Sequence, residues 1–566
     1  MILRGLVICA QAFVSVQAGT AASEAEPAPK LVVGIVVDQM RYDFIYRYWN
    51  EYGEGGFKRL VKEGAFYRNA EYNYVPTFTG PGHASIFTGT TPASHGIVAN
   101  DWFDRARGKT VYCVEDTNYT SVGVANASDG PRSPSRLLAT TVTDELKLAT
   151  PASKVVGISL KDRAAILPAG HLADGAYWFD DRSGSWITSS YYTNTHTTPH
   201  TNMLPEWVAS FNGLNRAGWY LKTNWTTLKD ITAYGASLPN DDPSKKKLSR
   251  KEDHLGFPHD LPVLFDQEAT NKNRFGLIRT TPFGNSLTKE FAEAAVRGEG
   301  LGRSDHTDFL TINFASTDYA GHRFGPRSVE VEDVYLRLDG TLSEFLGFLD
   351  GWVGRTNVIV FLTADHGVVD VPNTSTNAGP HSPAEVFDWD RAKKSLTDRM
   401  EIKYGGKLMA HFINQQIYFD TNFVALHHHE QADIEEDVRD WLVQQEGVAD
   451  VIASRNLRIQ AGSGVIYSDL ANGFYPRRSG DMTVLLQPGW LDKTDVGEGT
   501  ATSHGTPYQY DTHVPILFWG WHVPHLVCDE PVTITEIAPT LCQLLKIQFP
   551  SASMNSILPG LRIEDR

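Results

Sequence analysis

The chain has 566 residues, of which 41% are hydrophobic and 11% aromatic, so it can bury a large core and is long enough for two or three structural units. Its formal net charge of −16 argues against nucleic acid or an anionic membrane surface as a partner. An anionic ligand would therefore have to be held by local positive charge, from a metal ion or from a few well-placed cations.

The first 22 residues have the pattern of a secretory signal peptide, in which Arg4 precedes an apolar run from Leu6 to Ala18 and small residues follow. The run is too short to span a membrane, and no later segment resembles a span. We therefore expect a protein that is exported across the inner membrane, periplasmic if the source is bacterial, with no stable membrane insertion. In such an oxidising compartment, Cys528 and Cys542 are the pair that we expect to form a disulfide.

Three continuous apolar runs each end in an acidic residue. They are Leu31–Val37 before Asp38, Phe309–Thr317 before Asp318, and Val358–Ala364 before Asp365 and His366. Strands this apolar are buried on both faces, so we predict an α/β fold with a central, largely parallel mixed sheet sandwiched by helices. In such sheets the ligand site lies beyond the carboxyl ends of the strands, so the three acids point to one place.

The stretch Tyr74–Gly89, which lies between the first two of these runs, reads YVPTFTGPGHASIFTG. Pro81 suits the first position of a helix. Thr79 and Gly80 would then lie at the N-terminus of that helix, where unpaired backbone amides attract anions. Thr79 also fits the simpler role of an N-cap or turn residue. This stretch alone leaves both interpretations open.

The remaining elements follow from hydrophobic spacing. They are helices at Thr288–Val296 and Val329–Leu349, a late strand at Val514–Gly520 and a closing helix at Thr535–Leu545. Two regions depart from the pattern and are predicted to form caps over the strand ends. Region 186–275 is rich in Asn, Thr, Trp and Tyr, and its charged run Pro243–Asp253 is predicted to be a solvated loop.

The second of these regions, 373–480, contains a predicted strand–helix–strand unit formed by His411–Phe419, Gln431–Glu446 and Val448–Ser454. The predicted division of the chain is then a signal peptide at 1–22, core parts at 30–185, 276–372 and 481–566, and insertions at 186–275 and 373–480. The nucleophile candidate falls in the first core part, and the metal-ligand candidates fall mainly in the second.

Residues whose side chains can bind metal ions lie at the predicted strand ends. The set comprises Asp38, Asp318, His322, Asp365, His366 and, in the loop Thr-Ser-His-Gly-Thr, His504. Asp318 and His322 are four residues apart and share one face if a helix starts there. Three carboxylates and three imidazoles can coordinate two zinc ions through nitrogen and oxygen if the Thr79 oxygen completes one ligand set.

The order of these motifs resembles the alkaline phosphatase superfamily. Asn100, Lys161 and Arg163 resemble the phosphate-irrepressible, PafA-type alkaline phosphatases, which use a threonine nucleophile, and the likeness runs from Leu31 to the segment at Glu536. By position, the resemblance implies one zinc ion held by Asp318, His322 and His504, and another held by Asp38, Asp365, His366 and the Thr79 oxygen.

The resemblance also implies that Thr79, rather than Thr77, attacks phosphorus and forms a phosphothreonine, with metal coordination activating the hydroxyl. Asn100, Lys161 and Arg163 would bind the substrate. A phosphate monoester dianion has three non-bridging oxygens; an arginine can bind two of them and a lysine supplies a point charge, which favours small-molecule monoesters over diesters. We therefore expect a broad-range alkaline phosphatase with two Zn²⁺ ions per chain. The oligomeric state is open, with a monomer favoured.

Two alternatives are kept. A nucleotide phosphodiesterase/pyrophosphatase of the same superfamily also uses two zinc ions and a threonine, but the Lys161–Arg163 pair fits a dianion better. An exported phosphate-binding protein without catalysis would explain secretion and an anion site, but it would not need a full set of metal ligands. A sulfatase is disfavoured because the nucleophile segment lacks the Cys/Ser-x-Pro-x-Arg pattern.

Overall fold

The computed structural model describes residues 28–195, 203–372, 385–427, 430–497, 499–554 and 556–561. The predicted signal peptide at 1–22 lies outside these residues. Within them, no helix combines the length and the apolar character needed to cross a membrane.

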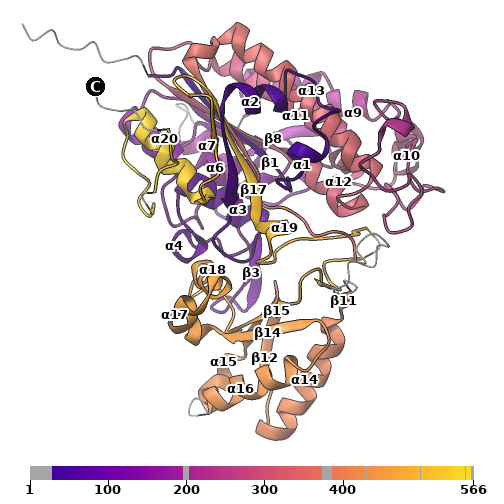
Figure 1. Cartoon of the computed structure of the whole chain (residues 1–566), viewed down its shortest axis with the longest axis vertical. Helices are drawn as coiled ribbons and strands as arrows, with labels where there is room; N and C mark the ends of the chain where they lie inside the picture. The colour runs from indigo at the N-terminus through magenta and orange to yellow at the C-terminus, as the bar shows by residue number, and fades with distance from the viewer. Residues whose placement is uncertain are drawn as a thin grey trace, which may run out of the picture.

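The centre of the molecule is an 11-stranded mixed sheet (Figure 1). Its main path runs β18 (Leu526–Cys528), β2 (Ala65–Glu71), β17 (His513–Gly520), β10 (Val358–Thr363), β1 (Leu31–Val37), β9 (Asp308–Phe314), β6 (Val155–Ser159), β7 (Gly175–Asp180), β8 (Ser185–Ser189) and β5 (Ser121–Val122), with β19 (Val532–Thr533) paired to β2. The five strands from β10 to β7 are parallel. Strands β17 and β8 join this parallel block antiparallel on its two sides.

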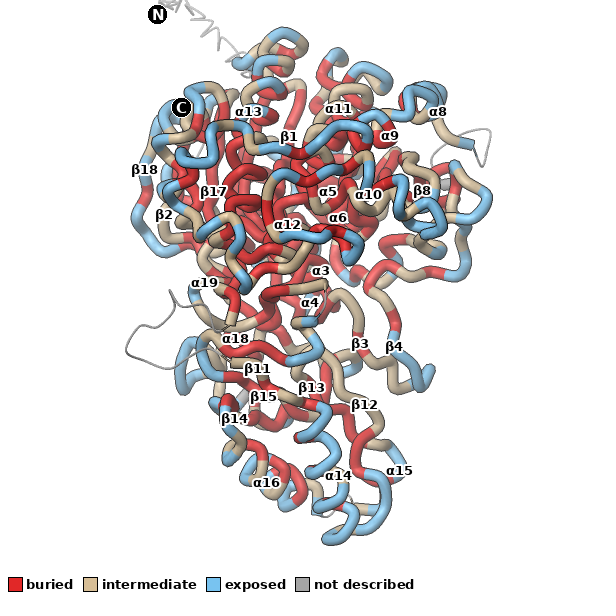
Figure 2. Tube along the Cα trace, turned by 90° about the vertical axis from the view of Figure 1, so that its right-hand side faces the viewer, coloured by how far each residue is buried: buried red, intermediate tan, exposed pale blue. Residues whose placement is uncertain are grey.

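Helices cover both faces of this sheet, as the apolar strands require. One layer contains α3 (Thr79–Thr88), α5 (Val142–Ala149), α6 (Asp162–Ala169) and α20 (Ile537–Leu545); the other contains α11 (Pro282–Glu299), α12 (Ser316–Phe324) and α13 (Val329–Trp352). Every residue of β1, β9 and β10 is buried between them, and Figure 2 shows this buried core through the body of the molecule. The predicted fold class is confirmed.

A smaller α/β lobe projects from the body (Figures 1 and 2). It contains a four-stranded antiparallel sheet in the order β12 (Met409–Ile413), β13 (Gln416–Phe419), β15 (Met482–Leu486) and β14 (Val448–Ala453). Helices α14 (Trp389–Tyr404) and α16 (Gln431–Leu442) share a separate hydrophobic core with these strands. The boundary predicted at residue 480 falls between β14 and β15, and that predicted at 185 falls at the start of β8.

The remaining elements of the body and the lobe are short. The strands are β3 (Asp101–Asp104) paired with β4 (Lys109–Tyr112), and β11 (Val386–Phe387) paired with β16 (Leu491–Asp492). The helices are α1 (Phe44–Arg47), α2 (Phe57–Glu63), α4 (Pro92–His95), α7 (Ser190–Thr195), α8 (Glu206–Gly213), α9 (Arg216–Tyr220), α10 (Leu261–Gln267), α15 (Thr421–Leu426), α17 (Leu457–Gln460), α18 (Val465–Gly473) and α19 (Gln509–Thr512). The 3₁₀ helices include η2 (Arg274–Thr280).

Three local predictions need correction. His411–Phe419 is not one strand but a hairpin, because Asn414 and Gln415 adopt positive φ angles of 54° and 56° and reverse the chain. The charged run Pro243–Asp253 is not wholly solvated: Lys245 is buried and pairs with the buried Glu330 of α13 at 2.7 Å. Cys113, Cys528 and Cys542 are all buried and unpaired, so the expected disulfide is wrong. Cys528 ends an edge strand, whereas Cys542 lies in α20, which packs on α3 and α5.

Candidate active site

Three acids converge at the carboxyl ends of the parallel strands. Asp38 directly follows β1, and the two strands paired with β1 are β9 and β10. Asp365 comes two residues after β10, and Asp318 lies in the first turn of α12, which begins just after β9. Because adjacent parallel strands end at the same edge of a sheet, the three carboxylates meet there.

Helix α12 orients the first group of possible metal ligands. His322 lies four residues after Asp318 and therefore on the same helix face, so that His322 Nε2 is 3.1 Å from Asp318 Oδ1. His504, which arrives on the loop before α19, has its Nε2 3.8 Å from the same carboxylate oxygen. Asp318, His322 and His504 each offer an atom within 4.8 Å of the others, which is close enough to share one metal ion.

A second group of possible ligands lies beside the first. Asp38, Asp318 and His366 also bring their ligand atoms within 4.8 Å of one another, so Asp318 belongs to both groups. Asp365 is adjacent: its Oδ2 lies 3.5 Å from His366 Nε2 and has no hydrogen-bond partner among the described residues. A buried carboxylate oxygen without a partner is costly, and a cation is the usual way to satisfy it.

The three imidazoles are oriented as metal ligands usually are. In each of them Nδ1 donates to a backbone carbonyl: His322 to Thr502 (2.7 Å), His366 to Gly367 (2.9 Å) and His504 to Thr77 (2.8 Å). This hydrogen bond keeps the proton on Nδ1 and leaves the lone pair on Nε2, which faces the carboxylates. The donor set of oxygens and imidazole nitrogens therefore fits zinc.

Burial and charge shift the titration of these groups in opposite directions. Burial lowers the pKa of His366 to about 4 and that of His504 well below its usual value, so both rings are neutral. Burial, reinforced by the neighbouring Asp38, raises the pKa of Asp365 well above its usual range. Burial also acts to raise the pKa of Asp318, but His322 and Lys161 outweigh it and lower that pKa well below its usual range. The site thus concentrates negative charge that needs cations.

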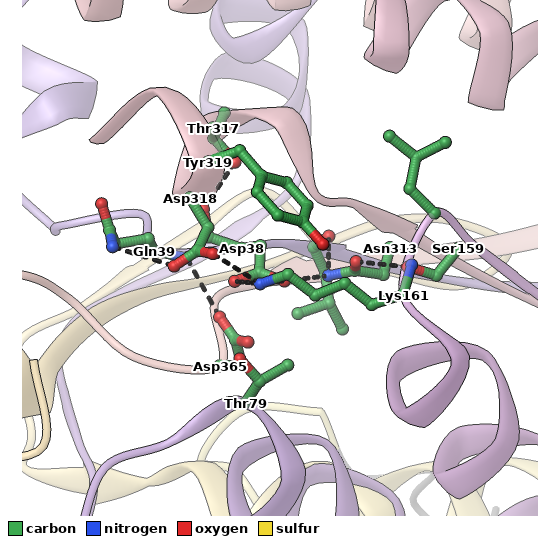
Figure 3. A network of polar contacts seen from close by, with 12 residues as sticks. Asp38, Gln39, Thr79, Ser159, Lys161, Asn313, Thr317, Asp318, Tyr319 and Asp365 are labelled. Atoms are coloured by element: carbon green, nitrogen blue, oxygen red, sulfur yellow. Dashed lines mark hydrogen bonds and ion pairs between the residues drawn. The ribbon is translucent and has the colours of Figure 1, made fainter. Parts of the chain in front are cut away.

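Lys161 reaches into this carboxylate group (Figure 3). Its Nζ lies 2.9 Å from Asp38 and 2.6 Å from Asp318, and the side chain is almost fully buried. Burial lowers the pKa of Lys161, but Asp318 and Asp38 outweigh it and raise that pKa, so the ammonium stays charged. Lys161 therefore pairs with two of the three acids, but its single positive charge balances only one of them.

Thr79 is the first residue of α3, and the residue preceding the helix is Phe78. Both the predicted start at Pro81 and the N-cap interpretation of Thr79 are therefore wrong: Pro81 is the third helical residue, and its fixed φ is still compatible with the first turn. The Thr79 hydroxyl faces the site, 3.4 Å from His366 Nε2 and 3.4 Å from the guanidinium of Arg163. Gly82 allows this approach, because a Cβ there would lie 2.4 Å from the Asp365 carbonyl oxygen.

Arg163 and Asn100 lie on the other side of Thr79. One Arg163 nitrogen donates to Thr79 Oγ1 and another to the Tyr112 hydroxyl at 3.1 Å. Asn100 accepts a 2.7 Å hydrogen bond from the Gly80 amide through its side-chain carbonyl, which leaves its NH₂ group as the donor for a ligand. All ten predicted site residues are thus brought to one edge of the sheet.

Several residues that sequence reasoning missed hold this arrangement together. Gln39 has a left-handed backbone with φ of 63°; its amide donates to Asp365 Oδ1 and its side chain donates to Asp318 Oδ1. Asn313, near the end of β9, donates to Asp38 Oδ2 at 3.2 Å. In the sequence, only their positions could have identified these two residues. Gln39 follows the acid at a strand end, and Asn313 is a polar residue within an apolar strand.

Known proteins are similar to this chain in both sequence and structure. A family model described as type I phosphodiesterase / nucleotide pyrophosphatase matches residues 32–507. The chain is 43% identical over 543 residues to alkaline phosphatase PafA of Elizabethkingia meningoseptica, a match that covers 96% of each chain. It is 41% identical to alkaline phosphatase PhoV of Synechococcus elongatus, over 94% of this chain and 93% of that protein. The crystal structure of wild-type PafA superposes with a TM-score of 0.87, covering 94% of this chain and 99% of that one.

Proposed function

The chain belongs to the type I phosphodiesterase / nucleotide pyrophosphatase family and, within the alkaline phosphatase superfamily, to the PafA-type phosphomonoester hydrolases; on that premise we propose that it is an exported, zinc-dependent alkaline phosphatase that acts through a phosphothreonine. The observation that carries the proposal is the position of the Thr79 hydroxyl. It lies at the first turn of a buried helix, between the Arg163 guanidinium and the carboxylate–imidazole groups.

Thr79 is the proposed nucleophile. Its Oγ1 bonds to phosphorus as the bond from phosphorus to the alcohol oxygen breaks; the hydroxyl proton passes to solvent, and the departing alkoxide takes up a proton from solvent to leave as the alcohol. Water then attacks the phosphothreonine, releases inorganic phosphate and restores the hydroxyl. Two zinc ions, when bound, supply the positive charge that acidifies the hydroxyl and stabilises the departing oxygen.

The residues that would hold these ions are those that the two ligand groups contain, together with Asp365 and the Thr79 oxygen. The fit rests on the chemistry of the donors: imidazoles that present Nε2, and buried carboxylates, of which Asp365 Oδ2 has no hydrogen-bond partner among the described residues. We assign the ligands as the resemblance implies, with Asp318, His322 and His504 at one ion and Asp38, Asp365, His366 and Thr79 at the other. The first set is one of the two ligand groups described above, whereas the second group contains Asp38, His366 and the shared Asp318.

Substrate recognition is proposed to fall to Arg163, Asn100 and Lys161. One Arg163 nitrogen already contacts Thr79 Oγ1 while another is held by the Tyr112 hydroxyl, and a guanidinium in that position can bind two phosphoryl oxygens at once. The Asn100 amide group and the backbone amides at the start of α3 add further donors. Lys161 contributes positive charge from the carboxylate side.

Export is proposed from the pattern of residues 1–22, which carry a charge, an apolar run and small residues in the order of a signal peptide. Mass spectrometry of the mature protein checks it: a chain that starts near residue 19 or 23 supports export, and a periplasmic chain that retains Met1 contradicts cleavage.

A diesterase remains the alternative, since the description of the matching family names phosphodiesterases. The test is the double variant Lys161→Ala/Arg163→Ala, with kcat/KM measured for an aryl phosphate and for its methyl diester at matched zinc content. Loss of one donor to transition-state charge costs on the order of 10²–10³ in rate. We expect the monoester to lose at least this much and the diester far less, because the diester offers one fewer free oxygen. Equal losses would favour the diesterase.

A further inference from the structure

The charged run Pro243–Asp253 is attached beside the candidate active site. Its Lys246 amide donates to the Arg323 carbonyl at 3.0 Å, and the Arg323 guanidinium donates to the Lys247 carbonyl at 3.2 Å. The buried ion pair between Lys245 and Glu330 secures the same segment to α13. Arg323 directly follows His322, so this run borders the site; Figures 1 and 2 show α12 near α10, the helix that follows the run.

The site opens to solvent at this edge. The His322 side chain is 25% exposed, whereas those of Asp38, Asp365 and His366 are 0% exposed. Substrate that reaches Thr79 must leave any protruding group on the open side. Because Arg323 directly follows His322 in α12, the surface around Arg323 adjoins this side of the site.

A basic groove occupies that surface. It is formed by two adjoining surface pockets with volumes of about 960 and 760 Å³, which include the space at their openings to solvent. Arg250 and Arg323 line both pockets. The cations that line it are Lys246, Lys247, Arg250, Arg274 and Arg323, together with the buried, ion-paired Lys245. One acid, Glu268, lies in its wall. Gly499, which also lines it, leads along the chain to His504.

Such a concentration of positive charge is unusual in a chain with a net charge of −16. A groove lined by one sign of charge raises the local concentration of the opposite ion. Guanidinium groups in particular match the geometry of phosphate oxygens. An extended polyanion fits this lining better than a neutral or apolar group does.

We propose that this basic groove binds the additional phosphate groups of substrates that carry a polyphosphate chain, such as nucleoside di- and triphosphates, while their terminal phosphoryl group lies at Thr79. The assignment rests on the proposed function. The bond that breaks joins the terminal phosphorus to its bridging oxygen, and the leaving group is the shortened phosphate chain, which departs through the groove. The groove residues bind the leaving group and do not touch the transferred phosphoryl group.

The test compares a nucleoside triphosphate with an aryl phosphate in the variant Arg250→Gln/Arg274→Gln, at matched zinc content. We expect kcat/KM for the triphosphate to fall about tenfold at low ionic strength and the aryl phosphate to change less than twofold, because field effects of this kind span roughly 10–10³. The triphosphate deficit should shrink in 0.5 M salt (a concentration chosen to screen exposed charges, with a Debye length of about 4 Å). Lys246→Gln/Lys247→Gln, which replaces a separate pair of cations, should behave in the same way.

Two further variants act as controls. Glu268→Gln removes the acid of the groove and should raise kcat/KM for the triphosphate, whereas Lys62→Gln removes an exposed cation on α2, outside the groove lining, and should change nothing. Equal losses for both substrates in the double variants would mean general attraction of anions and would overturn the subsite. Unchanged triphosphate kinetics in both double variants would overturn it as well.

Binding separates this inference from the proposed function. Inorganic tripolyphosphate is titrated by calorimetry into zinc-loaded Thr79→Ala protein with and without Arg250→Gln/Arg274→Gln, after circular dichroism has shown that both are folded. About tenfold weaker binding in the triple variant supports the groove even if the wild-type enzyme turns over no monoester. Equal binding contradicts the groove even if the enzyme is a phosphatase.

Discussion

Tyr112 is the residue through which Arg163 is held in place. Its hydroxyl donates to Asp162, accepts from Arg163 and lies in a chain that continues from Asp162 to Arg132. Arg163 Nε has no hydrogen-bond partner among the described residues, so the Tyr112 contact is one of two side-chain contacts that orient the guanidinium. Tyr112 is thus a positioning residue for a group that we propose binds the phosphoryl oxygens.

Replacing Tyr112 with phenylalanine removes this hydrogen bond and keeps the ring. A hydrogen bond to a charged group is worth about 1.5–3 kcal/mol, so we expect kcat/KM for an aryl phosphate to fall roughly tenfold or more. The methyl diester should lose less, and a purely structural defect would lower both alike. Steady-state kinetics with the two substrates, together with a thermal melt, distinguish these cases.

Thr79 and Thr77 offer a matched pair of hydroxyls two residues apart. Thr77 Oγ1 donates a hydrogen bond to the Thr506 carbonyl at 3.2 Å, whereas Thr79 Oγ1 faces His366 and Arg163. We expect Thr79→Ala to abolish the phosphoenzyme and Thr77→Ala to cost about 1 kcal/mol of stability and little activity. Mass spectrometry after an acid quench locates the phosphate; finding it on Thr77 would reverse the assignment.

At the scale of elements, the loop that precedes α10 depends on a buried charged cluster. His259 Nδ1 lies 2.8 Å from Glu252 and its Nε2 lies 3.5 Å from Glu330, which also pairs with Lys245. Burial lowers the pKa of His259, but the two glutamates outweigh it and raise that pKa above its usual value. The same cluster secures the charged run against α13.

This cluster predicts a pH-dependent stability. Because the pKa of His259 is raised in the folded state, its contribution is complete below the unfolded value of about 6.5 and is lost as pH rises through the folded value. His259→Asn should therefore destabilise the protein by about 1–3 kcal/mol at pH 6 and by less at pH 9. Urea denaturation of both proteins at the two pH values measures this difference. A difference that grows with pH would contradict the assignment of charge.

The elements themselves were largely predictable, because their periodicity is local. The helix predicted at Val329–Leu349 is α13, and the strands predicted before Asp38 and Asp365 are β1 and β10. The errors lie where neighbours decide. The Asn414–Gln415 turn depends on two left-handed residues other than glycine, and the strand predicted to reach Thr317 ends at Phe314 because α12 begins at Ser316.

At the scale of the whole molecule, we expect metal binding to stabilise the folded chain. Asp38, Asp318 and Asp365 are buried together, with Lys161 pairing directly with the first two. Ions that bind only the folded chain stabilise it by about 4 kcal/mol at a thousand times Kd. We expect about two zinc ions per chain, because the two ligand groups share Asp318 and together contain more residues than the four ligands of one tetrahedral site.

Removal of the metal with a chelator should abolish turnover and lower the melting temperature, and added zinc should restore both. Elemental analysis and calorimetry on the same samples provide the readout. Full activity in a sample verified to be metal-free would contradict the zinc-dependent mechanism. One zinc ion per chain at saturation would contradict metal binding by the second ligand group.

What the sequence by itself determined was the kind of chemistry and its place on the sheet. Continuous apolar runs of this length that end in acids are typical of strands buried on both faces, and adjacent parallel strands present their ends together. The tertiary structure alone decided how each group is held and where the site opens. Tyr112 reaches Arg163 from 51 positions away, Gln39 joins Asp318 to Asp365, and a lysine run 76 positions from Arg323 meets its guanidinium. Such contacts depend on the packing of distant segments, which local periodicity does not encode. They decide which hydroxyl faces the metal-ligand groups and which edge of the site is lined by cations.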